Sequence, residues 1–184
     1  MGFRKWFGRR DSDPEDFCEE LTLDAMRVGF LVDYDLKTWE VIGYNTYDYD
    51  GFETQEWVLR CGEEVRFLER EEDDGQVEWS LTRRIRIARI QEPVVDRIRA
   101  GEDPPEVIHF EGRRYEAVEC SAGLFYEGGG GEGREFVEWN YESGEERLLS
   151  ISQWGENDFS AYEGEYVEEY QFTDILPGAE ERNL

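Results

Sequence analysis

The chain has 184 residues, with 46 acidic and 20 basic side chains and a formal net charge of −26. Phosphate binding depends on clustered Lys and Arg, so this charge balance argues against nucleic acid as a partner. Hydrophobic residues make up 39% and aromatic residues 15% of the sequence. That composition supports a packed core and separates the chain from acidic disordered proteins.

The excess of acid has two interpretations, and both stay open. Lysine occurs only at Lys5 and Lys37, and acids crowd every loop, as in the halophilic-type composition of a salt-rich or GC-biased host. Alternatively, the acidic surface is a functional face for cations or basic partners.

Cysteine usage and hydropathy indicate the compartment. Cys18, Cys61 and Cys120 are far apart and form no CxxC motif, which argues against a disulfide framework and a zinc ribbon. No run approaches the roughly 20 apolar residues of a membrane span, and the first residues lack the apolar stretch of a signal peptide. We therefore expect a cytoplasmic protein.

Residues 1–10, MGFRKWFGRR, are basic and aromatic and contain no acid. A helical turn would place Phe3, Trp6 and Phe7 on one face with the cations around them. Weak, reversible contact with an anionic membrane surface is one interpretation, and an untethered terminus is the other. The candidate membrane or anion contacts are Arg4, Lys5, Trp6, Phe7, Arg9 and Arg10. Residues 11–20 add an acidic spacer.

Alternation of apolar and polar residues, the period of β-strands, dominates from residue 29 onward. A short helical turn is expected over 19–27, before the first strand. Asp50-Gly51 and Asp74-Gly75 are two-residue hairpin signals, because both central positions need a positive φ. The first strands are expected at 30–34, 38–44, 55–59, 65–70, 77–81 and 84–87.

One helix is expected next, beginning at Pro93 and ending before Gly101, with an apolar stripe of Val94, Val95 and Ile98. Strands then resume at 107–110, 115–120, 135–141, 147–152 and 166–172. The chain is therefore predicted to be mainly β, with antiparallel strands and one short bridging helix.

A repeat runs through the predicted strands. Glu56-Trp57 precedes Gly62-Glu63-Glu64, and Glu138-Trp139 precedes Gly144-Glu145-Glu146, with the same Trp-to-Gly spacing of five. The repeat predicts an internal duplication, in which two related β-units share a core. The predicted units are a tag and spacer (1–20), a first β-unit (21–90), a helix and linker (91–105), a second β-unit (106–178) and a tail (179–184). A single sandwich without internal symmetry is the alternative.

Five stretches carry a resemblance to a known family: MRVGFLVDYDLKTWEVIG, EWVLRCGEEVRFLE, FEGRRYEAVE, VEWNYESGEERLLSISQW and YEGEYV. With these stretches the chain resembles the bacterial domain-of-unknown-function family 4178 over residues 21–177. Where family members often place Asp after the glycine of the first strand, this chain has Phe30. The resemblance implies an accessory protein without an established activity, and a gene context of membrane stress or polyamines.

No catalytic, cofactor or metal residue is assigned from the sequence. His109, the one histidine, is expected to be an ordinary strand residue. GGGGEG (128–133) lacks the ending of a phosphate loop and is expected to be a hairpin loop. Arg83, Arg84, Arg86 and Arg89 follow the acidic run EREEDD, and cross-strand ion pairs with that run are expected when the hairpin closes.

Two functions of different classes follow. The first is a non-enzymatic accessory or interaction module that presents a β surface to a protein partner. The second is a small-molecule binder, for carbohydrate or a cation such as a polyamine, that uses aromatic and acidic side chains; Trp39 and Trp154 are its candidate ligand surface. A pocket lined by these residues with Trp57 and Trp139 would favour the binder, although the latter two are expected in the core. An enzyme ranks third, and oligomeric state is left open.

Overall fold

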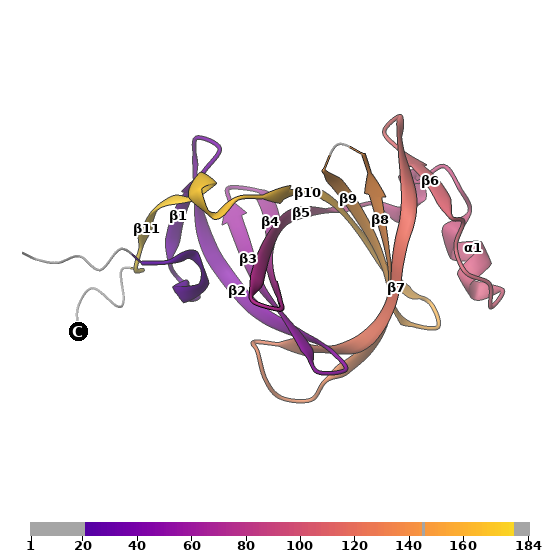
Figure 1. Cartoon of the computed structure of the whole chain (residues 1–184), viewed down its shortest axis with the longest axis horizontal. Coiled ribbons are helices and arrows are strands. Elements are labelled where there is room, and N and C mark those ends of the chain that lie inside the picture. The colour runs from indigo at the N-terminus through magenta and orange to yellow at the C-terminus, as the bar shows by residue number, and fades with distance from the viewer. Residues whose placement is uncertain (1–20, 145, 179–184) are drawn as a thin grey trace, which may run out of the picture.

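The computed structural model describes residues 21–144 and 146–178 and shows a mainly antiparallel β protein (Figure 1). The first half contains β1 (Leu31–Tyr34), β2 (Lys37–Tyr49), β3 (Phe52–Cys61), β4 (Glu64–Asp73) and β5 (Gln76–Ile85). The second half contains β6 (Val107–Phe110), β7 (Arg113–Glu127), β8 (Arg134–Ser143), β9 (Arg147–Gly155), β10 (Asp158–Val167) and β11 (Thr173–Leu176). The helical elements are η1 (Leu23–Ala25), η2 (Ile87–Arg89), α1 (Val94–Arg99) and η3 (Glu169–Gln171).

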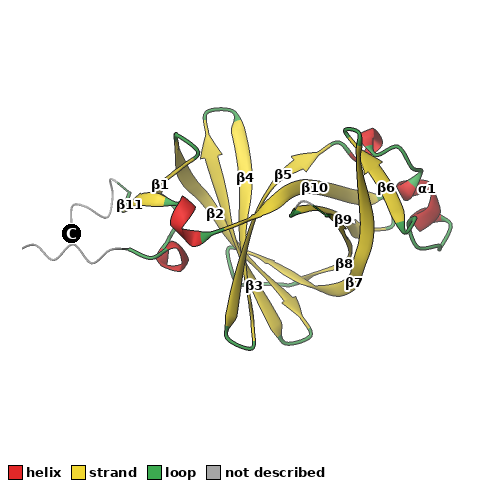
Figure 2. Ribbon diagram, turned by 45° about the horizontal axis from the view of Figure 1, so that its top comes forward, coloured by secondary structure: helices red, strands yellow, loops and turns green. Residues whose placement is uncertain are grey.

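All the described strands belong to one sheet, and that sheet closes on itself. The strand order is β11-β1-β2-β3-β4-β5-β10-β9-β8-β7-β6, and β2 pairs additionally with β7. The strands from β2 round to β7 therefore form a closed ring, seen nearly end-on in Figure 1 and tilted in Figure 2. The edge strands β1 and β11 extend from one side of the ring, and β6 with α1 lies at the other.

The alternating sequence gives the ring one apolar and one polar face, because successive side chains of a strand point to opposite faces. On β3, Trp57 and Leu59 are buried in one hydrophobic cluster while Glu56 faces the other way. On β8, Trp139 and Tyr141 are buried in a second cluster while Glu138 faces the other way. Elements beside the ring complete the two clusters. Residues of η1 and Phe172, which directly precedes β11, belong to the first cluster, and residues of α1 and β6 belong to the second.

Two glycines allow the closest strand approaches in the ring. A Cβ on Gly164 of β10 would lie 2.1 Å from the backbone oxygen of Leu81 on β5. A Cβ on Gly123 of β7 would lie 2.5 Å from the backbone oxygen of Asp48 on β2. Both contacts fall where one half of the chain pairs with the other. Any larger residue would force these strands apart, so ring closure depends on both glycines.

Most of the expected elements form, but two of the expected strands do not. Both hairpin turns form, with positive φ at Asp50, Gly51, Asp74 and Gly75, and α1 follows Pro93 as expected. The strand expected at 166–172 is wrong, because β10 occupies Asp158–Val167 and η3 follows it. The separate strand expected at 84–87 is also wrong: β5 continues to Ile85, and η2 begins at Ile87.

Each half begins with a short strand followed by four longer ones, and the second half ends with the additional short strand β11. The repeated Glu-Trp pairs lie on β3 and β8, each in the third strand of its half. The internal duplication is nevertheless not confirmed, and it stays a prediction together with the predicted unit boundaries. The N-terminal tag and its six candidate contact residues lie outside the described residues.

Candidate functional site

The polar face of the ring encloses an acidic cavity of about 130 Å³. Every strand of the ring except β3 contributes to its lining. Its carboxylates are Glu69, Glu71, Glu78, Glu119, Glu138 and Glu142. Neither lysine nor arginine is among the residues that line it. A more open hollow of about 380 Å³ shares Tyr49, Glu71, Glu119 and Asn140 with this cavity, so the acidic space extends outward from the ring.

Glu138 and Glu69 form the inner part of the cavity, where both are partly buried. The Tyr49 hydroxyl donates a hydrogen bond of 3.0 Å to Oε2 of Glu138, and the Ser152 hydroxyl donates one of 2.9 Å to Oε1. Glu69 lies on the neighbouring side of the ring, directly opposite Glu56 in the register of β3 and β4. Hydrogen-bond donors thus hold Glu138 in place, whereas Glu69 faces another carboxyl group.

Glu56 does not line this cavity, but it lies beside Glu69 in the register and is buried more deeply, with 3% of its surface exposed. The Asn45 side-chain amide donates a hydrogen bond of 2.6 Å to its Oε1, and the Tyr47 hydroxyl donates one of 3.1 Å to its Oε2. These donors come from β2, whose residue Asn45 is paired with Glu56 in the sheet. The strand register therefore sets Glu56 beside Asn45 and Glu69, and hydrogen bonds orient the carboxyl groups of Glu56 and Glu138.

Burial and mutual repulsion raise the pKa values of these groups. Burial raises the pKa of Glu56 to about 7, against the hydrogen bonds from Asn45 and Tyr47, which lower it. Burial and the nearby charges of Glu56 and Glu138 hold the pKa of Glu69 well above its usual range. Burial also raises the pKa of Glu138. Glu69 and Glu138 have no lysine or arginine among the residues that line the acidic cavity with them, and burial favours their neutral forms.

A buried hydroxyl at the cavity has no hydrogen-bond partner. Thr82 lines the acidic cavity and is 2% exposed, and its Oγ1 is one of three buried side-chain atoms without a partner in the described part of the chain. A buried hydroxyl without a partner costs about 1–3 kcal/mol. The lining therefore offers an unused hydroxyl as well as uncompensated carboxylates to an occupant.

The carboxylates surround a space and do not converge on one point. Within residues 21–144 and 146–178, no three His, Cys, Asp or Glu side chains lie close enough together to hold a metal ion. A single divalent cation takes several oxygen ligands at one position, whereas an organic cation with separated ammonium groups meets acceptors along its length. The carboxylates that line this cavity are spread around it and are not gathered at one coordination position.

The four tryptophans considered for a ligand pocket divide between the hydrophobic core and the ring interior. Trp57 is fully buried, Trp139 is 9% exposed, and both lie in the hydrophobic clusters as expected. Trp39, a candidate ligand residue, is also in the core, with 3% of its surface exposed. Trp154 is partly buried and lines the opposite end of the ring interior. The pocket of four tryptophans that would have favoured the binder does not form, because three of the four are in the core.

Sequence reasoning missed Glu56, Glu69 and Glu138 because 46 acids offered no way to choose among them. The signal was the repeated Glu-Trp pair. If each tryptophan is placed in a core, alternation turns the preceding glutamate to the opposite face. In the closed sheet that face is the interior.

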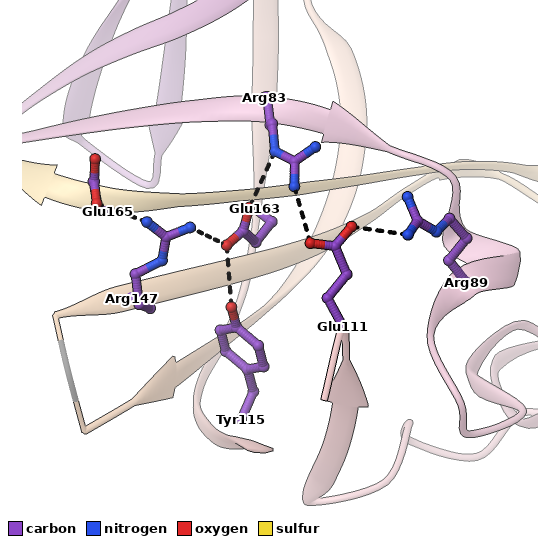
Figure 3. Close-up of polar contacts among 7 residues, drawn as sticks. All are labelled: Arg83, Arg89, Glu111, Tyr115, Arg147, Glu163 and Glu165. Carbon is purple, nitrogen blue, oxygen red and sulfur yellow. Dashed lines mark hydrogen bonds and ion pairs between the residues drawn. The ribbon is translucent and has the colours of Figure 1, made fainter. Parts of the chain in front are cut away.

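A second polar cluster, shown in Figure 3, lies on the outer face of β10. Glu163, 4% exposed, accepts hydrogen bonds from Arg83 at 3.2 Å and from the Tyr115 hydroxyl at 3.2 Å, and it pairs with Arg147. Further ion pairs join Arg147 to Glu165 and connect Glu111 with Arg83 and Arg89. Each carboxylate and guanidinium of this cluster has an opposite charge beside it, so we assign it a structural role.

These contacts correct the expected ion pairs of the basic stretch. The acidic run does fold against β5, but Glu71 and Glu72 face Glu78 and Val77 across the hairpin. Arg83 lies further along β5 than the residues that face the acidic run. It pairs with Glu163 of β10, the strand on the other side of β5 from β4. Cross-strand pairing with EREEDD is therefore wrong, because the register places the arginines too far along the strand.

The remaining sequence candidates have ordinary surroundings. His109 lies on β6, and its Nδ1 is 2.7 Å from Oε1 of Glu92. Residues 128–133 connect β7 to β8, which confirms the hairpin loop. Cys61 and Cys120 are free thiols. No helix in the described ranges is long and apolar enough to cross a membrane.

The fold and interior define an antiparallel β protein whose closed sheet surrounds a carboxylate-rich space. The chain belongs to the family of the domain of unknown function DUF4178, whose model matches residues 27–169. It is similar to an uncharacterized protein of Aquifex aeolicus (strain VF5), with 24% identity over 181 residues, which are 96% of this chain and 99% of that protein. No solved structure matches the chain.

Proposed function

We propose that this protein binds a small organic cation, with separated ammonium groups as in a polyamine, inside its closed sheet. The observation that carries the proposal is the acidic cavity: six carboxylates line it, and no lysine or arginine does. Buried like charges raise each other's pKa values, as they do for Glu69 beside Glu56 and Glu138. An ammonium group would relieve that repulsion, and the free hydroxyl of Thr82 supplies one more acceptor.

The shape of the space supports an extended ligand. The cavity of about 130 Å³ holds a slender chain, and the adjoining hollow of about 380 Å³ shares four lining residues with it. Partly buried Glu69 and Glu138 would meet one ammonium group, and exposed Glu71 and Glu119 would meet another nearer the rim. This binder is favoured over the carbohydrate binder, because Trp39, Trp57 and Trp139 are in the core and offer no stacking platform to a sugar.

Isothermal titration calorimetry tests the proposal with 1,4-diaminobutane and spermidine as probes, at constant ionic strength. We expect saturable binding to the wild type and at least about a tenfold loss of affinity in the double variant Glu69→Gln/Glu138→Gln, because each glutamine removes a charge without changing the shape. The matched control is Glu106→Gln, an exposed glutamate outside both hollows.

Three results would overturn the proposal. The first is the absence of saturable binding to either amine. The second is an equal effect of the double variant and Glu106→Gln, which would indicate general attraction to an acidic surface. The third is tighter binding of Mg²⁺ or of a neutral sugar than of either amine.

We propose an interaction module as the second candidate, because exposed apolar side chains lie along one sheet edge. β11 has β1 as its hydrogen-bonded neighbour in the described sheet. Leu36, Tyr170 and Leu176, which lie on or next to these strands, are 105%, 78% and 47% exposed. An open strand edge with apolar side chains fits a protein partner. A pull-down with wild type and Leu176→Lys tests it; equal capture by both proteins would contradict this role for the edge.

A further inference from the structure

The ring interior has a second cavity, of about 360 Å³, at the end opposite the acidic cavity. The acidic cavity reaches the β4–β5 hairpin through Glu71 and Glu78, whereas the second cavity reaches the β9–β10 hairpin through Trp154 and Asp158. The antiparallel register of β5 and β10 places these hairpins at opposite ends of the ring. Each strand of the ring contributes at least one residue to the second cavity, so its lining runs all the way round the ring.

Aromatic rings form most of those walls. The aromatic residues are Tyr47, Phe67, Phe125, Trp154 and Tyr162. Phe67 and Tyr162 are in edge contact with centroids 5.1 Å apart, and Phe125 lies 5.1 Å from Tyr47 and 5.4 Å from Trp154. These contacts keep the rings in position without a ligand. A wall of fixed aromatic rings attracts cations that carry little hydration, methylated ammonium groups above all.

The charged groups of the cavity are ordered from its inner end to its mouth. Glu56 lies at the inner end, buried and held by Asn45 and Tyr47. Arg84 is exposed at the strand end and forms no ion pair with a described residue. Arg134, in contrast, is 2.5 Å from Asp158 and lies over the ring of Trp154. The cavity therefore offers a carboxyl group inside, aromatic walls, and one unpaired guanidinium at the mouth.

We propose that this second cavity binds a small zwitterion, with a methylated ammonium group among the aromatic rings beside Glu56 and a carboxylate paired with Arg84. The site is separate from the amine site of the acidic cavity, and its ligand differs in chemistry.

The hydrogen-bond inventory favours a methylated over a primary ammonium group. A primary ammonium donates three hydrogen bonds and needs three acceptors. Here each oxygen of Glu56 already accepts one bond, and Ser160 Oγ accepts one from Trp154 Nε1 at 2.7 Å, so a primary ammonium would have to share acceptors that are already partly used. A trimethylated group donates none, so the same environment suits it: aromatic faces for contact and a buried carboxylate for charge.

Calorimetric titration with three probes tests the proposal. Glycine betaine carries both groups, choline lacks the carboxylate, and glycine lacks the methyl groups. For the wild type we expect glycine betaine to bind most tightly and glycine not to bind measurably. Arg84→Gln should weaken glycine betaine about tenfold and leave choline unchanged, because it removes only the partner of the carboxylate. Arg86→Gln, on an exposed arginine outside the cavity, is the matched control and should match the wild type.

Glu56→Gln and Trp154→Leu should weaken both methylated probes, and unchanged circular dichroism verifies their fold. Tighter binding of glycine than of glycine betaine overturns the proposal, and so does no binding of any probe. An equal effect of Arg84→Gln and Arg86→Gln would also overturn it. Thr82→Val separates the two sites: it should weaken 1,4-diaminobutane in the acidic cavity while glycine betaine still binds as in the wild type, so either proposal can fail alone.

Discussion

Glu56 makes a specific contribution to the pH dependence of stability. Burial raises its pKa to about 7 in the folded protein, compared with 4.5 for an unperturbed glutamate. A folded-state pKa above the unfolded value means that the native protein holds a proton which the unfolded chain releases. The stability associated with that proton is fully present below the unfolded pKa and is lost as pH rises through the folded pKa.

The magnitude follows from the two pKa values. The difference between 4.5 and about 7, at about 1.4 kcal/mol for each pH unit, corresponds to about 3 kcal/mol over the full titration. About 2 kcal/mol of this falls between pH 5.5 and pH 8.5. Glu56→Gln removes the titration and resembles the protonated acid, since its amide can accept from Asn45 and donate to Tyr47.

Urea unfolding across that pH range measures the effect. The free energy of unfolding of the wild type should fall by about 2 kcal/mol more than that of Glu56→Gln. Glu106→Gln, on an exposed glutamate, should follow the wild-type curve. If the curves of wild type and Glu56→Gln run parallel, Glu56 titrates as it does in the unfolded chain, and the buried-carboxyl interior is wrong.

Four further outcomes are expected. Gly164→Ala should destabilise the fold by about 3 kcal/mol or more in urea unfolding, because its Cβ would meet the β5 backbone. The control is Gly144→Ala, whose Cβ would have no atom within 4 Å. An equal effect of the two variants would refute strand contact as the cause. Glu163→Gln should cost about 2 kcal/mol by leaving Arg147 and Arg83 with a neutral partner, and a change within 0.5 kcal/mol (about the effect of a surface substitution) would contradict this. The melting midpoint should rise from low to molar NaCl, since a net charge of −26 repels itself unless screened; a flat or falling midpoint argues against it. Vesicle co-sedimentation at low salt should show more binding of the full chain to anionic lipid than of a truncation that starts at Asp11, and equal pelleting would exclude a membrane role for residues 1–10.

The mainly β fold could be predicted because its signals are local. Alternation identifies most strands, and Asp50-Gly51 and Asp74-Gly75 identify two hairpins. The length of β2 and β7 could not be predicted, since their ends pair with each other only when the sheet closes. That pairing joins Asn45 to Glu127. These residues are far apart in the sequence, and local sequence patterns carry no information about such long-range pairing.

The interior was predictable only in part, for a related reason. Alternation shows that Glu56 and Trp57 point in opposite directions, but not which direction is the inside. Reasoning that hydrophobic residues are buried and acids are exposed places Glu56 on the surface. In a closed sheet with hydrophobic clusters against its outer face, both residues are buried. Trp39 was also predicted as a ligand residue, but its side chain is buried in the hydrophobic core.

Amide NMR during titration with 1,4-diaminobutane shows whether the ring interior binds an organic cation. We expect saturable shifts concentrated on strand residues that line the acidic cavity, such as Ser80, Thr82 and Ser150. We expect these shifts to disappear in Glu69→Gln/Glu138→Gln. Shifts spread over the exposed acids, or unchanged by the double variant, would contradict binding in the ring interior.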